Sequence, residues 1–309
     1  MNLSLFDLHC DTAYEMLRQK QPLTQNKLAV SLQNAAKFAR YTQVMALWTD
    51  HNLDDEAGWT AALKMLDNLS ADPAITEGRA RIVTRCPTDA STLPTLMLGV
   101  EDARILNGRL ARVDELYRRG VRILTPLWKG HTSIGGSHDT DQGLTDFGAH
   151  AIDRAVTHGM IPDVSHASEK SADEIFEIAN RHSRPVIASH SNAYALCPVS
   201  RNLRDRQIGA ILASGGVIGI NLYGAFLNTE APATIADILR QIDYFLTLGA
   251  VDALCLGCDM DGCTLPKDIP DLSALPRLAE AMLAAGYTEA TVQQIFHENA
   301  EKFAQNYIF

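Results

Sequence analysis

Hydrophobic residues along the chain fall into eight short runs, and longer segments of mixed character separate these runs. The runs are rich in β-branched residues and show little alternation between apolar and polar positions. This pattern is typical of parallel strands that are covered on both faces. The predicted strands are residues 3–9, 43–48, 95–101, 121–127, 160–165, 185–190, 217–223 and 253–259.

The intervening segments carry apolar residues at helical spacing, and several have start and stop signals. Gly120, Gly159 and Gly249 follow three of these segments as C-terminal caps, and Ser168 offers an N-cap to a fourth. The predicted helices are residues 59–69, 109–119, 147–158, one that begins at Ser168, 234–248, 272–285 and 288–307.

Strands that alternate with helices in this way predict an α/β fold, the (β/α)8 TIM barrel, formed by residues 1–309 as a single domain. A doubly wound open sheet is the alternative. It usually has fewer strands and often carries a glycine-rich phosphate turn. The glycine-dense turn at residues 134–138 does not match such a turn, so the pattern favours the barrel.

Composition excludes several classes of function. Hydrophobic residues make up 46% of the chain, and the net charge is −10 without a basic stretch, which argues against a nucleic-acid partner. No apolar run approaches the roughly 20 residues that span a bilayer, and residues 1–6 lack the features of a signal peptide. We therefore expect a cytoplasmic protein with no membrane partner. Cys255 and Cys258 have C-x-x-C spacing, but their strand-like context favours buried structural thiols over a redox pair.

Residues that bind metals lie at the ends of the predicted strands. The first strand runs into Asp7-Leu-His9-Cys-Asp11, and alternation along an extended strand predicts that Asp7, His9 and Asp11 point the same way. Further imidazoles and carboxylates end four other strands. They are Glu101, His166, His190 and Asp259. In a barrel the C-terminal strand ends share one face, so these side chains are expected to converge there.

A helix cap or a surface hydrogen bond would explain any one of these residues. Together they predict a metal site, because burying several charged and polar groups without a cation costs free energy. Imidazole and carboxylate without thiolate suit Zn, Mn, Fe or Ni, and zinc is the usual choice for hydrolysis. Five ligand groups exceed what one catalytic zinc takes from a protein. We therefore expect two zinc ions, with His9 and Asp11 on one and His166 and His190 on the other. In this arrangement Glu101 bridges the ions, a shared hydroxide is the nucleophile, and Asp259 transfers protons.

The motifs resemble those of the membrane (renal) dipeptidase family, metallopeptidases with amidohydrolase-like barrels. They run nearly from end to end and in order: D-x-H-x-D at residues 7–11, G-V-E at 99–101, G-L-T-x-F-G at 143–148, D-x-S-H at 163–166, S-H-S at 189–191 followed by R-N at 201–202, and G-x-D-x-D-G at 257–262. Any one motif is weak, whereas the ordered set is highly specific.

The resemblance implies a binuclear zinc dipeptidase with the ligand set given above and with Asp259 as the catalytic acid/base. Arg201 matches the residue that pairs with the C-terminal carboxylate of the dipeptide, a task that suits a guanidinium fork. Mammalian members carry a substrate-contacting His where this chain has Trp128, and His131, three residues on, is the candidate substitute. Tyr223, at the end of the seventh predicted strand, is a candidate pocket residue or a core residue.

The family also tolerates a D-configured C-terminal residue, so the expected substrates include dipeptides of mixed chirality. A homodimer is expected only by analogy with relatives. Two alternatives remain. Another amidohydrolase, such as a lactonase, deaminase or phosphotriesterase, is disfavoured because residue 11 is Asp and the third predicted strand ends in Glu101. A barrel that binds metal without catalysis is disfavoured because no ligand is missing.

Overall fold

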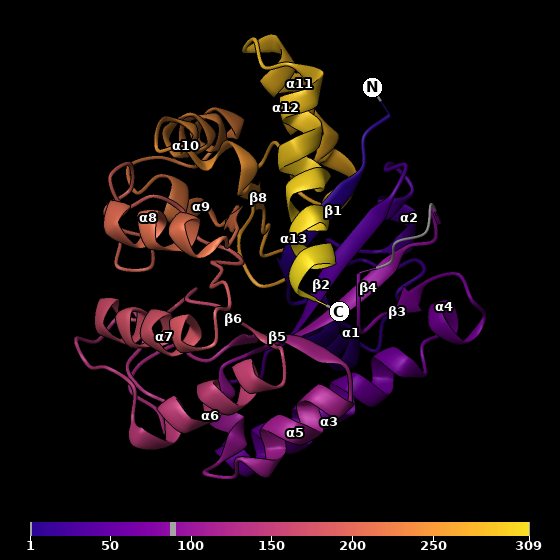
Figure 1. Ribbon diagram of the computed structural model, residues 1–309. Coiled ribbons are helices and arrows are strands. Elements are labelled where there is room, and N and C mark those ends of the chain that lie inside the picture. The colour runs from indigo at the N-terminus through magenta and orange to yellow at the C-terminus, as the bar shows by residue number, and fades with distance from the viewer. Residues whose placement is uncertain (1, 87–90, 309) are drawn as a thin grey trace.

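Parallel strands form the centre of the protein in the computed structural model, which describes residues 2–86 and 91–308. The strands are β1 (Leu5–Cys10), β2 (Tyr41–Leu47), β3 (Arg81–Ile82), β4 (Thr95–Glu101), β5 (Val121–Thr125), β6 (Ile161–Pro162), β7 (Ile218–Ile220) and β8 (Leu254–Leu256). Their order in the sheet is β6-β5-β4-β2-β1-β8-β7, and β3 pairs with the edge of β4 outside this path. The sheet curls into a half-barrel with helices around it (Figure 1).

The longer helices surround the sheet, and strands such as β1 and β4 are buried along their whole length. They are α1 (Thr12–Gln19), α3 (Asp55–Ser70), α5 (Ala111–Arg118), α6 (Asp146–Thr157), α7 (Glu169–Arg181), α8 (Asp205–Ser214), α10 (Ile235–Thr247), α11 (Pro276–Ala284) and α13 (Asn299–Tyr307). Short helices α2 (Leu32–Ala35), α4 (Pro73–Thr76), α9 (Gly224–Leu227) and α12 (Glu289–Gln293) lie in the connections. Short turns of 3-10 helix are η1 (Ala103–Leu106), η2 (Ala250–Asp252) and η3 (Leu272–Ala274).

A second apolar cluster fills the concave side of the sheet, apart from the core between sheet and helices. Strand residues such as Phe6, Val44 and Met97 meet Phe303 of α13 in this cluster. Helix α13, yellow in Figure 1, therefore covers one end of the curved sheet. A π-helical turn, η4 (Gln294–Glu298), joins α12 to α13, so the helix expected at 288–307 is a single run with a π-turn inside it.

The predicted strand at residues 185–190 is the largest departure from expectation. It forms no ladder, and its described contacts with neighbouring strands are single parallel bridges, Asp163 to Ile187 and Ala188 to Ile218. These bridges lie next to β6 and β7, the two ends of the sheet path. The described strands therefore form an α/β half-barrel, whose two ends are linked through residues 187 and 188 by single bridges.

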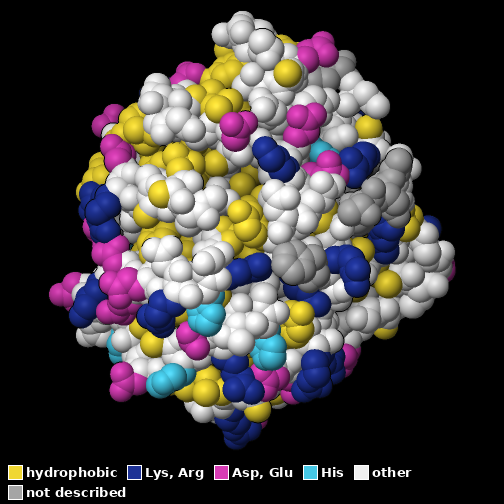
Figure 2. Space-filling view, viewed as in Figure 1, with side chains coloured by type: hydrophobic (Ala, Val, Ile, Leu, Met, Phe, Trp, Pro, Cys, Tyr) yellow, Lys and Arg dark blue, Asp and Glu magenta, His cyan; other side chains and the backbone are white. Residues whose placement is uncertain are grey.

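The surface, the helices and the cysteines add three observations. On the face crossed by α13, acidic and basic side chains are interspersed among the described residues, with no broad area of one sign (Figure 2). Within residues 2–86 and 91–308, the structure contains no helix with both the length and the apolar character that crossing a bilayer requires. Cys255 and Cys258 are buried free thiols, in agreement with their interpretation as structural residues.

Candidate metal centre and active site

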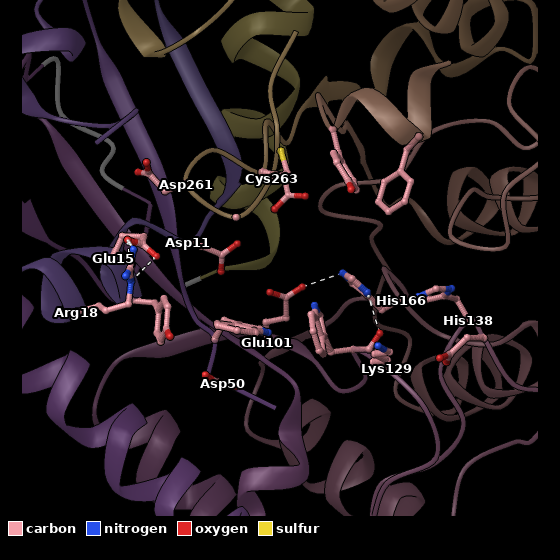
Figure 3. A pocket seen from close by; sticks show the side chains of 18 residues that line it. Asp11, Glu15, Arg18, Asp50, Glu101, Lys129, His138, His166, Asp261 and Cys263 are labelled. Atoms are coloured by element: carbon pink, nitrogen blue, oxygen red, sulfur yellow. Dashed lines mark hydrogen bonds and ion pairs between the residues drawn. The ribbon is translucent and has the colours of Figure 1, made fainter. Parts of the chain in front are cut away.

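The predicted metal-binding residues meet at the end of the sheet opposite α13, and four of the six predicted metal ligands and acid/base residues line a cavity of about 730 Å³. Asp11, Glu101, His166 and Asp259 contribute to its floor, and Figure 3 shows the carboxylate of Glu101 directed toward the ring of His166. These residues follow β1, β4, β6 and β8, whose C-terminal ends lie together because the strands are parallel.

Glu101 lies at the centre of the group, and its two carboxylate oxygens face different partners. Oε1 lies 2.9 Å from Nε2 of His166 and 3.3 Å from Nε2 of His190. Oε2 lies 3.5 Å from Nε2 of His9. One buried carboxylate therefore connects two sets of imidazoles, as a ligand shared between two cations would.

The hydrogen bonds of His166 show why this arrangement fits a cation. Its Nδ1 lies 3.0 Å from the main-chain oxygen of Trp128, and a carbonyl oxygen only accepts, so Nδ1 carries the proton. Burial lowers the pKa of His166 to about 4, and the nearby charge of Arg201 adds to this effect. The neutral ring then turns the lone pair of Nε2 toward Oε1 of Glu101. Two acceptors at that distance repel each other unless a cation lies between them.

A second group forms on the other side of Glu101. The Nε2 atom of His9 is buried without a hydrogen-bond partner, and it lies 3.7 Å from Asp11 Oδ2 and 3.9 Å from Asp259 Oδ1. These separations are too long for hydrogen bonds but allow ligand atoms to surround an ion. Gly262 makes the close packing feasible, because a Cβ atom at that position would lie 1.9 Å from Oδ2 of Asp11.

The electrostatics of the group follow from burial and like charge. Burial raises the pKa of Glu101, but the charge of His9 acts in the opposite direction, and this pKa lies well below its usual value. Burial lowers the pKa of His9, whereas the carboxylates of Glu101 and Asp11 raise it well above the usual value. Burial raises the pKa of Asp259 to about 8, despite the opposing effect of His9.

The prediction that Asp7 shares a face with His9 and Asp11 is wrong. Asp7 pairs with Gln43 and Cys10 pairs with Met45, so β1 contains one more residue than β2 between these points. Such a β-bulge interrupts the alternation of side chains on which the prediction depended. Oδ1 of Asp7 instead accepts hydrogen bonds from the main-chain nitrogens of Cys258 at 2.8 Å and His9 at 3.3 Å.

Arg201 lies beside the group rather than in the lining of the main cavity. Its Nη1 donates to Oγ of Ser191 at 2.8 Å and its Nη2 donates to the main-chain oxygen of His190 at 2.9 Å. The Nε atom is buried without a partner. Arg201 lines a smaller cavity of about 300 Å³, and His138 lines both cavities. Burial lowers the pKa of Arg201 to about 10, so the guanidinium remains charged at neutral pH.

Comparison with known proteins identifies the chain. Residues 1–306 match the family of membrane dipeptidases (peptidase family M19). The chain belongs to the membrane dipeptidase family. This membership makes it a metallo-dipeptidase, a hydrolase of peptide bonds, in agreement with the resemblance noted in its motifs. Membership also implies a metal cofactor, and the buried imidazoles and carboxylates around Glu101 fit one.

Two solved structures cover the whole of this family member, and a curated relative covers 79% of it. A metallo peptidase from Rhodobacter sphaeroides, solved with a phosphinate mimic of the dipeptide L-Ala-D-Ala, is 25% identical, with a TM-score of 0.90 and 100% of both chains covered. The metallo peptidase named dipeptidase AC is 26% identical, with a TM-score of 0.90 and coverage of 100% of this chain and 99% of its own. An uncharacterized protein in the pqqA 5′ region of Klebsiella pneumoniae is 34% identical over 262 residues, which are 79% of this chain and 94% of the relative.

The sequence predicted only some of the aromatic residues that line the cavity of this dipeptidase family member. Trp128 and Tyr223 both line the cavity, whereas His131 is exposed and is not part of the lining. Trp48 packs against Trp128 with ring centroids 5.2 Å apart, and Phe226 packs against Tyr223 at 4.7 Å. Further lining residues that the sequence analysis missed are Tyr14, Asp50, Lys129 and His138. Most of them lie in connections, where no periodic pattern distinguishes a pocket residue from a surface residue.

Proposed function

We propose that the protein is a binuclear zinc dipeptidase that hydrolyses the peptide bond of small dipeptides, including dipeptides with a D-configured C-terminal residue. One observation carries the proposal. The buried carboxylate of Glu101 directs one oxygen to His166 and His190 and the other oxygen to His9. A carboxylate placed between two imidazole groups is the expected bridge of a two-metal site.

The residues that would hold the two ions divide around Glu101. His9 and Asp11 would bind one ion, and His166 and His190 would bind the other. The absence of cysteine thiolates from these groups favours a hydrolytic zinc site over a structural one. When bound, the ions supply Lewis acidity and an ionised water at neutral pH.

The chain itself supplies proton transfer through Asp259. Its Oδ1 faces the metal-ligand group, and its Oδ2 accepts a hydrogen bond from Nδ2 of Asn221 at 3.0 Å. That amide orients the carboxyl group so that Oδ1 is directed to the reacting side. In the proposed reaction Asp259 holds the proton at this position and delivers it to the departing amine.

Arg201 would set the length of the substrate. Its charged guanidinium is buried next to the ligand group, and its Nε atom has no partner within the described protein. A free C-terminal carboxylate is the natural complement of such a donor. In the proposal the substrate carboxylate pairs with Arg201 while the scissile carbonyl lies at the metal centre, which would restrict the substrate to two residues. The mimic of L-Ala-D-Ala in the Rhodobacter relative supports the extension to D-configured residues.

We also propose that the half-barrel closes into a complete (β/α)8 barrel and that residues 1–309 form one domain. Residues Ile187 and Ala188 form bridges to both ends of the sheet path. The concave apolar cluster also takes side chains from β1, β2, β4, β5, β6 and β8, from the 185–190 segment and from Val217 beside β7. A closed barrel would fill its interior in this way.

The test is a dipeptide library that contains all four chiral combinations, assayed on protein whose zinc content is measured in the same sample. We expect turnover of dipeptides at a zinc-to-protein ratio near two, and little turnover of the corresponding dipeptide amides or tripeptides. Lactones and phosphotriesters serve as competing substrates. Faster turnover of either competing class, or a saturated ratio near one, would contradict the proposed function.

A further inference from the structure

A buried carboxylate outside the ligand group accepts four hydrogen bonds. Asp163 follows β6 and is fully buried. Its Oδ1 accepts from the main-chain nitrogens of Ser165 at 2.9 Å and Ser189 at 3.0 Å. Its Oδ2 accepts from Oγ1 of Thr125 at 2.6 Å and Oγ of Ser189 at 2.5 Å. Donors therefore fill the acceptor positions of both oxygens, as an ionised carboxylate requires.

This arrangement determines where the proton of the Ser189 hydroxyl lies. The hydroxyl has one hydrogen, and it is donated to Asp163. Nδ1 of His190 lies 2.7 Å from the same Oγ atom, so at this contact the ring must donate and the hydroxyl must accept. The proton of the neutral imidazole is thereby placed on Nδ1. The lone pair of Nε2 is then free and faces Oε1 of Glu101 at 3.3 Å.

The backbone packing keeps the Ser189 hydroxyl next to Nδ1 of His190. A Cβ atom at Gly219 would lie 1.9 Å from the carbonyl oxygen of Ser189, and one at Gly257 would lie 1.8 Å from it, so the absence of side chains lets this carbonyl pack tightly. The main-chain nitrogen of His190 donates to Oγ of Ser165 at 3.1 Å. The hydroxyl of Ser189 is thus fixed before any ligand binds.

We infer that Asp163, acting through Ser189, is a positioning residue that keeps His190 in the tautomer and orientation needed for metal binding. The inference rests on the proposed role of His190 as a ligand. His166 reaches the same state by a shorter route, since its Nδ1 donates directly to the carbonyl of Trp128. Outer hydrogen bonds of this kind fix the ring and raise the basicity of the coordinating nitrogen.

Two measurements that do not depend on peptide hydrolysis test the inference. The first is the Kd for Zn²⁺, measured by competition with a chromophoric chelator. The second is the imidazole ¹⁵N spectrum of the metal-free protein, with the His190 signal assigned from its absence in His190→Gln. In the wild type we expect His190 to be protonated at Nδ1 and unprotonated at Nε2.

The variants distinguish control of the His190 tautomer from a general loss of structure in residues 185–190. Ser189→Ala should raise the Kd for Zn²⁺ about 10- to 100-fold, and Ser189→Thr, which keeps the hydroxyl, should restore most of the affinity. Asp163→Asn should move the His190 proton to Nε2, because the new amide donates to Ser189 and turns its hydroxyl toward the ring. Ser214→Ala is the matched control. The Ser214 hydroxyl accepts a hydrogen bond from the main-chain nitrogen of Val186, in the same segment, and has no described contact with the His190 ring.

Wild-type zinc affinity in Ser189→Ala, together with an unchanged His190 spectrum, would overturn the inference. An equal loss of affinity in Ser214→Ala would also overturn it, since it would assign the effect to the segment as a whole. If Asp163→Asn fails to fold, the two Ser189 variants still decide the outcome. Failure to hydrolyse any dipeptide would contradict the proposed function and leave these measurements valid.

Discussion

The two ends of the central strands are built on opposite principles. At the end covered by α13, apolar residues such as Phe6, Met97 and Phe303 pack against one another with almost no exposure. At the other end, β1 and β4 lead into buried imidazoles and carboxylates, and His9 keeps a nitrogen without a partner. The same strands therefore contribute stability at one end and chemistry at the other.

Backbone geometry follows the same division. His166 and Asp259 adopt positive φ angles of 70° and 58°, which non-glycine residues seldom occupy. Both residues belong to the polar end. Strain and unpaired buried groups of this kind persist where surrounding structure maintains them, and they gather at functional sites. The difference indicates that packing in the rest of the half-barrel holds the polar end in place.

Substitution of Glu101 should have the largest effect on the polar end. Glu101→Gln replaces the shared carboxylate with a neutral amide, so metal content should fall below half of the wild-type value and turnover should be abolished. Zinc analysis and a dipeptide assay on the same sample measure both quantities. Glu280→Gln, an exposed change of the same type, should retain full activity. Full zinc content with normal turnover in Glu101→Gln would contradict the proposed role of Glu101 as a bridging ligand.

Asp259→Asn should separate chemistry from metal binding. The amide cannot release a proton to the leaving amine, so kcat should fall about 1,000-fold, within the range for loss of a general acid. Zinc content should stay at the wild-type level, because His9, Asp11 and the other ligands remain. Asp252→Asn, an exposed change on η2, is the control. Retained turnover would show that the proton comes from another group.

Arg201→Gln should weaken recognition of the substrate carboxylate. Loss of a charge-assisted contact of roughly 1.5–3 kcal/mol predicts that kcat/KM for free dipeptides falls about 10- to 100-fold. The dipeptide amides, which lack the carboxylate, should be affected far less. Arg204→Gln is the comparison variant, since the Arg204 guanidinium packs over Tyr194 outside the main cavity. Equal losses for acids and amides would indicate that Arg201 acts through its bonds to Ser191 and His190 instead.

Phe303→Ala should have the smallest effect on activity and a large effect on stability. Removing this ring from the apolar end leaves a cavity, which should lower the free energy of unfolding by about 3–5 kcal/mol. Denaturant unfolding gives this value, and kcat/KM measured well below the new Tm should stay within about two-fold of the wild type. A large fall in kcat/KM without a change in stability would reverse the division between the two ends.

Much of the fold was predictable because its elements carry strong periodic patterns. The strand expected at 95–101 is β4 with the same bounds, and the expected helix beginning at Ser168 is α7 with that residue as its N-cap. Helix α8 was missed, since Gly209 in its interior weakens the helical pattern. The segment 185–190 forms single bridges in place of the expected strand, because hydrophobic composition alone does not show whether a run forms a ladder.

The site was predictable to the extent that parallel strand ends converge. His9, Asp11, Glu101, His166, His190 and Asp259 do lie together, as their positions after separate strands indicated. The orientation of Asp7 was not predictable, because one extra residue in β1 reverses the face of a side chain without any signal in composition. His138 was not recognised as a cavity residue because it lies in a connection between elements.

The orientation of His166 by a main-chain oxygen has a consequence for how this enzyme diversifies. Every amino acid has the carbonyl that Trp128 presents to the imidazole, whereas the indole ring faces the cavity. A change of residue type at position 128 can therefore reshape the space offered to a substrate while His166, a proposed metal ligand, keeps its orientation. The side chain of residue 128 would then influence which substrates bind, and its main-chain oxygen would help to retain the proposed metal ion.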